Sequence, residues 1–293
     1  CHDGTQYKAV GTDKWNEILN NNDYMKTQYT ILSGSKLPTE YNEVALVVDS
    51  YNRISATVLN QLGISYSAEA SKIDYDDLVG KEFRLITNDN YYKKQDLGNG
   101  KYLYAAASTQ EDLYLAYESG ISVKIVSVIR ENKDASASWV SSGIAYTEAL
   151  TNKILELNNE TEIVEYQKQN PEYNVLSGKM FKEEASAGGF GGMFGGSSNS
   201  YESNLVKLGG DSTPTSITVY PKDFESKEKI KQILNAWNDS EIYKIFGNEK
   251  DADGNYLADT YKVTYTDFSS MMVSMLSSLI DIITYALVAF SAI

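Results

Sequence analysis

Apolar positions recur along the chain with two different periods, which predicts a fold that mixes helices and strands. Strands are predicted at residues 44–48, 82–87, 102–107, 121–129, 217–220 and 261–265. Helices are predicted at residues 13–22, 55–62, 108–117, 146–157, 160–169 and 226–238. The first strand, VALVV, is apolar throughout, as in a strand that is covered on both faces. This mixture favours an α+β or split α/β arrangement.

The most apolar part of the chain is its C-terminal segment. Residues 271–293 contain one charged residue, Asp281, and neither Gly nor Pro. A helix that spans a bilayer needs about 20 mostly apolar residues. We therefore expect a continuous helix that starts in water, is capped by Thr266 or Asp267, enters a membrane and continues past the last residue.

Several side chains define this expected membrane-entering helix. They are Asp267, Met271, Met275, Leu279, Asp281, Ile282, Tyr285 and Phe290. Met271, Met272, Met275, Leu276 and Leu279 recur at helical spacing and predict an apolar stripe, which ordinary packing explains better than a ligand role. Because a lone charge in hydrocarbon is costly, Asp281 is expected near the outer interface or paired inside a helix bundle.

A short internal repeat indicates how the chain is divided. Residues 29–34 read YTILSG and residues 173–178 read YNVLSG, and each copy precedes a predicted apolar strand and an amphipathic helix. A match of six residues can arise by chance, but the shared order of elements favours duplication. Two such units would form one subdomain from residues 1–64 and 144–265. An inserted, mostly β subdomain would occupy residues 65–143, and a stalk and membrane helix residues 266–293.

A glycine-rich loop is expected at residues 185–204, which include the sequence AGGFGGMFGGSSNS. Such composition predicts a flexible segment, and it matches no phosphate-binding glycine pattern. Phe190, Met193 and Phe194 are the apolar residues of this loop. They stand either in a solvated linker or at a loop tip that contacts a membrane, a ligand or a partner.

The charge and the residue counts exclude several functions. The chain carries 40 acidic and 26 basic residues, a formal net charge of -14, which disfavours nucleic acid as a partner and would attract cationic peptides. Cys1 and His2 are the single cysteine and histidine, so Ser-His and Cys-His catalysis and the usual zinc sites are disfavoured. We expect no catalytic, metal or cofactor-binding residue in this chain. Residues 250–256 lack the full calcium-loop pattern and predict a turn. Cys1 fits a lipidated N-terminus less well than a piece of a longer protein.

Three stretches together resemble a known family. Residues 29–49 (YTILSGSKLPTEYNEVALVVD), 173–181 (YNVLSGKMF) and 277–293 (SSLIDIITYALVAFSAI) resemble the MacB/FtsX-type permeases of ABC transporters, in versions from Gram-positive bacteria. The resemblance implies a porter-like extracytoplasmic domain with an inserted subdomain, held at the cell membrane. It also implies a non-catalytic role: the domain would couple ATP hydrolysis to export or substrate handling outside the cell by mechanotransmission.

The resemblance further implies the partners. These are an ABC ATP-binding subunit or domain that holds ATP and Mg²⁺, a second permease copy, the lipid bilayer, and cationic peptides or another exported substrate. The main alternative is an extracellular binding or adhesion module with a single membrane anchor. An extracellular hydrolase is a third hypothesis, which the histidine and cysteine counts disfavour.

Overall fold

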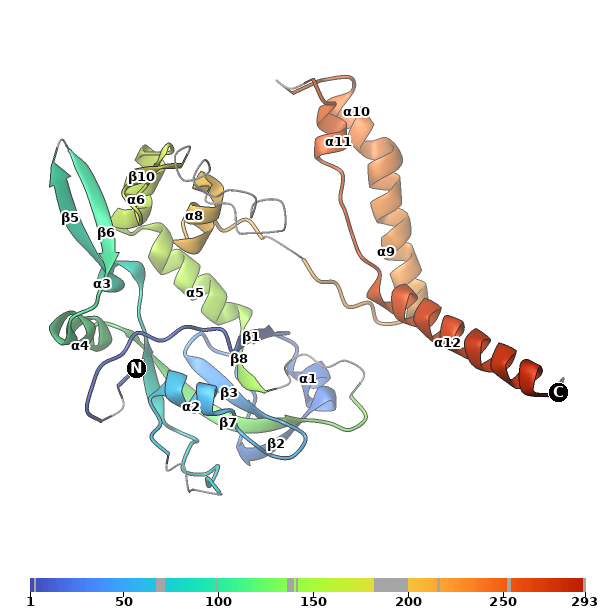
Figure 1. Cartoon of the computed structure of the whole chain (residues 1–293), viewed down its shortest axis with the longest axis horizontal. Coiled ribbons are helices and arrows are strands. Elements are labelled where there is room, and N and C mark those ends of the chain that lie inside the picture. The colour runs from blue at the N-terminus through green and yellow to red at the C-terminus, as the bar shows by residue number, and fades with distance from the viewer. Residues whose placement is uncertain are drawn as a thin grey trace. The chain divides into compact units, whose positions relative to one another are not determined.

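The structure is a computed structural model, and it divides the chain into two compact units, Cys1–Thr213 and Pro214–Ile293 (Figure 1). It describes residues 1–2, 4–66, 72–98, 100–135, 140, 142–181, 200–214, 217–251 and 254–291. The first unit contains a mixed sheet and helices, and the second is helical in its described part. The expected α+β class is therefore confirmed.

The first unit holds all the strands of the described chain. They are β1 (Trp15–Ile18), β2 (Tyr29–Gly34), β3 (Glu43–Val48), β4 (Glu82–Leu85), β5 (Tyr92–Gly98), β6 (Lys101–Ala106), β7 (Ile121–Glu131), β8 (Gly143–Thr147), β9 (Tyr173–Asn174) and β10 (Lys179–Met180). Its helices are α1 (Asn22–Gln28), α2 (Ala56–Leu62), α3 (Asn88–Tyr91), α4 (Gln110–Glu118), α5 (Glu148–Asn159), α6 (Glu162–Gln169) and α8 (Tyr201–Lys207). The second unit contains α9 (Phe224–Ala236), a π-helical turn (Trp237–Glu241), α10 (Ile242–Phe246), α11 (Leu257–Thr260) and α12 (Phe268–Ser291).

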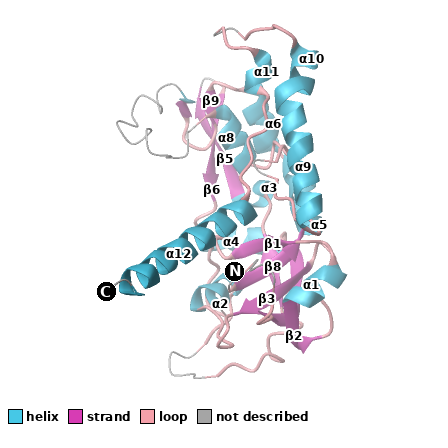
Figure 2. Cartoon of the chain, turned by 90° about the vertical axis from the view of Figure 1, so that its right-hand side faces the viewer, coloured by secondary structure: helices cyan, strands magenta, loops and turns pink. Residues whose placement is uncertain are grey.

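Strand β7 organises the six-stranded sheet, because three other strands pair with it. β3 runs parallel to it on one side. β2 and β4 run antiparallel along its other side, β2 against its C-terminal half and β4 against its N-terminal half. Beyond β3, β8 pairs antiparallel and β1 adds a parallel edge strand, so the sheet is mixed (Figure 2).

Strand β3 packs into both faces of this sheet. Val44, Leu46 and Val48 belong to a core cluster that includes residues of α2. Ala45 and Val47 belong to a second cluster, which includes a residue of α1. All five side chains are buried, as expected for a strand that reads VALVV. Helices α1 and α2 therefore cover opposite faces of the sheet.

A third core cluster surrounds the β5–β6 hairpin. Its buried members are Tyr104, Ile163, Val164, Tyr173, Val175, Leu205 and Leu208. The hairpin is joined to residues far along the chain, because the main-chain N–H of Tyr104 donates to the carbonyl of Val175 at 2.9 Å. The buried Gln167 links β9 to α8: its amide nitrogen donates to the carbonyl of Tyr173, and its amide oxygen accepts from Asn204.

The helix expected at residues 13–22 is wrong. Residues 15–18 instead form β1, in which Trp15 lies opposite Ile144 of β8. The helix begins later, where Asn21 accepts a hydrogen bond from the Tyr24 N–H and so caps α1. Pairing with a strand more than 120 residues away overrode the local pattern, which an isolated window of sequence does not contain.

The strands expected at residues 217–220 and 261–265 are also wrong. Neither stretch pairs with a strand among the described residues. Residues 261–265 lie outside any helix, and their polar groups bond to side chains of a helix rather than to a neighbouring strand. The other expected strands and helices are present, with ends shifted by two residues at most.

The two copies of the six-residue match have different conformations. Residues 29–34 form the whole of strand β2. In the second copy only Tyr173 and Asn174 are extended, and the rest forms a turn that Gly178 closes by donating to the Asn174 carbonyl. The expected boundaries at 65 and 143 also cut the sheet, because β4 and β7 lie beside β2 and β3.

Phe190, Met193 and Phe194 of the expected loop lie outside the described residues. The loop expected at 185–204 ends earlier than its composition suggests, because Ser200 caps α8 and exchanges hydrogen bonds with Ser203. Lys250 and Tyr256 form an isolated antiparallel bridge, and the main-chain N–H of Asp251 donates to the Asn255 carbonyl, as expected for the two sides of a turn.

Candidate functional site at the start of helix α12

Helix α12 provides the strongest functional feature of the second unit. Residues Phe268–Val288 are long and apolar enough to cross a membrane, with a mean hydropathy of 1.8. At 1.5 Å per residue they reach about 30 Å, the thickness of a hydrocarbon core. The expected residues Met271, Met275, Leu279, Asp281, Ile282, Tyr285 and Phe290 all lie on this helix, and all are exposed. One such helix supports membrane anchoring.

Of the two capping residues expected from the sequence, Thr266 and Asp267, it is Asp267 that caps α12. Its carboxylate accepts from the Ser270 main-chain N–H at 2.9 Å and from the Ser270 hydroxyl at 2.7 Å. Its own carbonyl accepts from the Met271 N–H, which begins the helical hydrogen bonds. Because the first N–H groups of a helix have no partner inside it, this carboxylate stabilises the first turn.

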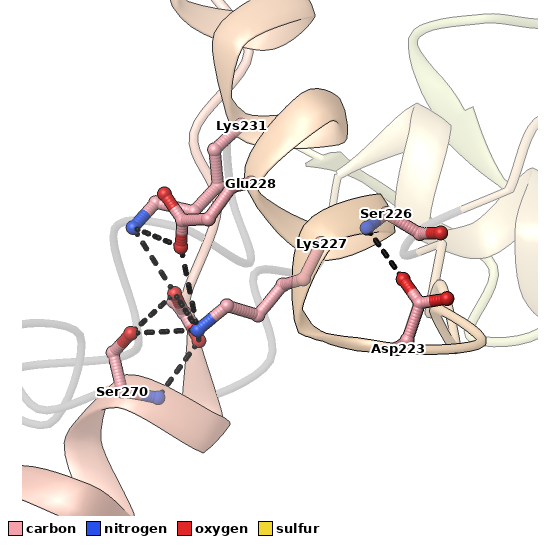
Figure 3. A network of polar contacts seen from close by, with 7 residues as sticks. Asp223, Ser226, Lys227, Glu228, Lys231 and Ser270 are labelled. Carbon is pink, nitrogen blue, oxygen red and sulfur yellow. Dashed lines mark hydrogen bonds and ion pairs between the residues drawn. The ribbon is translucent and has the colours of Figure 1, made fainter.

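Two lysines of helix α9, Lys227 and Lys231, form ion pairs with the same carboxylate (Figure 3). The Lys227 ammonium lies 3.2 Å from Asp267 and donates to the Ser270 hydroxyl at 2.9 Å. Lys227 is 8% exposed, and its ammonium lies 4.4 Å from the centre of the Phe224 ring. This buried lysine therefore joins two helices through one carboxylate and one hydroxyl.

A second lysine, one turn further along α9, completes the cluster. Lys231 lies 3.3 Å from Asp267 and 3.5 Å from Glu228. Two ammonium groups thus face two carboxylates, so the junction is electrically neutral. The Ser270 hydrogen bonds, together with the lysines, hold the pKa of Asp267 well below its usual range. The bond to Asp267 raises the pKa of Lys231.

The segment that leads into α12 is fixed along the same helix. The side-chain amide of Asn238 donates to the Val263 carbonyl and accepts from the Val263 N–H, both at 2.8 Å. The Tyr265 hydroxyl donates to Asn235 at 2.9 Å. Figure 1 shows this extended segment running beside α9 to the start of α12. It is held by side chains on its way to the helix cap, so it is not a free linker.

A π-helical turn and an aromatic stack stabilise the far end of this arrangement. The turn, Trp237–Glu241, joins α9 to α10 and contains Asn238, the residue that binds Val263. π-Helical turns often occur where a side chain must be reoriented for a contact. The Phe246 and Tyr261 rings stack at 4.8 Å with an interplanar angle of 8°. The segment is therefore held at both its ends and its middle.

Helix α12 has two chemically different faces. At 100° per residue, one side presents small and polar side chains at alternating spacings of four and three: Ser270, Ser274, Ser277, Asp281 and Thr284. We call this the polar seam. The opposite side presents large apolar residues, among them Met272, Leu279, Ile283 and Phe290, and includes the expected methionine stripe.

Two hydroxyls near the polar seam are satisfied inside the helix. The Ser278 hydroxyl donates to the Ser274 carbonyl at 2.9 Å, and the Thr284 hydroxyl donates to the Ile280 carbonyl at 2.8 Å. Such bonds let hydroxyls enter hydrocarbon at little cost. Asp281 has no hydrogen bond or ion pair with any described residue. Small residues at helical spacing are typical of faces on which membrane helices pack.

The sequence limited the cap to Thr266 or Asp267 but did not identify the partners of Asp267. Asp267 stood out because it precedes a long apolar run, whereas Lys227 and Lys231 look like ordinary exposed lysines of an amphipathic helix. Their spacing of four residues places them on one face of the helix, and this spacing was the one sequence feature that could have predicted a shared partner. Asn238 gave no signal, since its position depends on the π-helical turn. Within the described ranges, no three His, Cys, Asp or Glu side chains group as a metal site would require.

Comparison of this chain with protein-family models, with curated proteins and with solved structures finds no match. The features that bear on function are the geometry of the α9–α12 junction and the pattern of α12, and both belong to the second unit.

Proposed function

We propose that this chain is the extracytoplasmic part of an ABC-transporter permease of the MacB/FtsX type, at the cell membrane. In this proposal a partner subunit or domain binds ATP and Mg²⁺, and the present chain is not an enzyme. The first unit, with its mixed sheet, supplies the porter-like part. The second unit transmits movement between that part and the membrane helix, for export or another handling of a substrate outside the cell.

The observation that carries this proposal is the fixed connection at the start of α12. Lys227 and Lys231 bind Asp267, and Asn238 binds Val263 a few residues earlier. A membrane helix that is attached at several points cannot bend freely at its first turn. Movement of α12 along its axis or about it is therefore expected to move α9 as well, which is what mechanical coupling requires.

The polar seam favours a permease over the alternative of a binding or adhesion module with one anchor. A single anchor would leave Asp281 facing lipid, where an unpaired carboxylate is expensive. In a permease, further helices or a second copy of the chain offer a face that can pair it. The seam of Ser, Asp and Thr residues suits close helix packing of that kind.

The test is purification of the full-length protein from its native membrane in a mild detergent. We expect an ATP-binding subunit or domain in the same complex and Mg²⁺-dependent ATP hydrolysis by that complex. The matched control is the same preparation made with an inactive ATP-binding partner, which should keep the complex and lose hydrolysis. A full-length protein that carries no ATP-binding part and ends after one membrane span would overturn the proposal and favour the anchored binding module.

A further inference from the structure

Large apolar side chains are exposed on the second unit near the start of α12, outside the membrane helix itself. Phe224 is the first residue of α9 and is 69% exposed, and Phe268 is the first residue of α12 and is 67% exposed. Ile217, Val219 and Tyr220 precede α9 by a few residues and are exposed as well. We call these five residues the entry patch. Exposed apolar groups that gather in one place are typical of interaction sites.

The contacts along α9 show which end of that helix lies nearest to the start of α12. Three contacts follow one another along the two segments: Asn238 with Val263, Asn235 with Tyr265, and Lys227 with Asp267. The segment before α12 therefore runs antiparallel to α9, as Figure 1 shows. The N-terminal end of α9 lies at the level where α12 begins, and its C-terminal end lies far from that level.

The Phe224 ring belongs to this junction. The Lys227 ammonium lies 4.4 Å from the centre of the ring and donates to the Ser270 hydroxyl at 2.9 Å. The apolar run of α12 begins at Phe268 and is just long enough to cross the hydrocarbon of a bilayer. Its first turn therefore lies at the boundary between hydrocarbon and headgroups, and Phe224 lies beside that turn.

From this geometry we propose that the entry patch contacts lipid in the headgroup region of the membrane. The second unit then touches the bilayer at a site other than α12, and this contact fixes the tilt of α9 against the membrane surface. Aromatic side chains are favoured at this depth, and Phe224, Phe268 and Tyr220 supply three of them. The inference rests on the membrane location in the proposed function and on no property of an ATP-binding partner.

The charges around the entry patch indicate what kind of lipid contact this is. Residues 217–231 contain four lysines and three acidic residues. Two of the lysines, Lys227 and Lys231, pair with Asp267 and Glu228. Little positive charge remains to attract anionic headgroups, so apolar area provides the binding and neutral lipid is sufficient.

The experiment measures lipid contact in nanodiscs of neutral phosphatidylcholine, with the full chain carrying Cys1→Ser and one nitroxide label on an introduced cysteine. Phe224→Cys and Ile233→Cys are the matched pair, because both side chains lie on α9 and are 69% and 68% exposed. Ile233 lies roughly 14 Å further along the helix, away from the start of α12. A label at Tyr285→Cys, in the middle of α12, reports whether that helix is inserted.

Two relaxation reagents distinguish lipid from water and from protein. Oxygen concentrates in lipid, whereas nickel ethylenediaminediacetate stays in water. We expect the label at residue 224 to be at least about threefold less accessible to nickel than the label at residue 233, while it remains accessible to oxygen. Shielding of residue 224 from both reagents would show that protein covers the entry patch, and this would overturn the inference.

A second pair of variants tests the Phe224 ring itself, with the label at Val219→Cys. Phe224→Ser should raise nickel access at residue 219 by about twofold or more, and Ile233→Ser should leave it unchanged. Equal effects of the two serine substitutions, or equal nickel access at residues 224 and 233, would overturn the inference. If the Tyr285 label contacts lipid while the label at residue 224 contacts water, this inference alone fails. If the Tyr285 label contacts water, the membrane location fails together with it.

Discussion

The side chain of Asn238 and the main chain of Val263 bond to each other in both directions, each bond 2.8 Å long. Asn238→Leu removes both bonds, at about 1 kcal/mol for each. We expect hydrogen exchange at the Val263 N–H to accelerate by about tenfold or more, since that amide loses its acceptor. The neighbouring substitution Asp239→Leu is the control, because Asp239 is exposed and forms none of these bonds. Equal effects of the two substitutions would contradict the proposed role of Asn238.

The buried Lys227 should stabilise the first turn of α12 more than its exposed neighbour Lys229 does. Lys227→Met keeps the length of the side chain but removes its bonds to Asp267 and Ser270. We expect hydrogen exchange in the first turn of α12 to rise by about tenfold. Lys229→Met is the matched control on the same helix, since Lys229 is exposed and pairs with Glu225 alone. Unchanged exchange in Lys227→Met would show that the lysine does not fix the helix.

The hydrogen bonds between Asp267 and Ser270 should persist in mild acid. The pKa of Asp267 is lowered in the folded chain, so its stabilising effect is complete above the ordinary aspartate pKa near 4 and is lost as the pH falls toward the folded value. We expect exchange at the Ser270 N–H, which bonds to Asp267, to show no pH-dependent loss of protection between pH 7 and 5, after correction for the intrinsic rate. Protection should fall below about pH 4. Asp267→Asn should lack this acid step, and a step near pH 6 would contradict the assignment.

Glycine is required at the end of β2 for reasons of space. Gly34 has φ +92°, and a Cβ there would lie 2.3 Å from the Val126 carbonyl oxygen of β7. Gly34→Ala should therefore cost about 3 kcal/mol or more, from backbone strain and a clash with fixed main chain. Gly98→Ala is the control, because its φ is +81° but nothing lies within 4 Å, so only the strain of about 1 kcal/mol remains. Urea unfolding of both variants measures the difference.

The polar seam predicts how α12 meets a second permease copy. Under the proposed function, a cysteine at Ser277 should form a disulfide-linked dimer in the native membrane under mild oxidation, in a protein whose Cys1 is replaced by serine. Leu279 lies on the opposite face, so Leu279→Cys should form several times less disulfide-linked dimer. Asp281→Leu should lower cross-linking at Ser277 because it removes the polar centre of the seam. Equal cross-linking at the two positions would exclude the seam as the contact face.

Much of the fold follows from local sequence patterns. VALVV predicted a strand covered on both faces, and the helix predicted at residues 55–62 is α2, which Ser55 and Gly63 cap. The helix start at Thr266 or Asp267 was also predicted, because capping side chains precede a long apolar run, and Asp267 is the cap. These features depend on neighbouring residues, so a window of sequence contains their cause.

Other features depend on residues that are distant in sequence. Residues 15–18 have a pattern that fits a helix, and they become β1 because β8 offers a partner. The six-residue match becomes a strand near residue 30 and a turn near residue 175, because β7 pairs with the first copy alone. Strand pairing is decided by contacts across the fold, which no local pattern records.

The sequence by itself determined that α12 is apolar, that it starts at Thr266 or Asp267 and that an apolar stripe with three methionines runs along it, because helical periodicity is a local property. The tertiary structure decided what holds that helix. It placed Lys227 and Lys231 against Asp267 and bound Asn238 to Val263. Those pairings require side chains separated by 25 residues or more to meet, and only the folded chain brings them together.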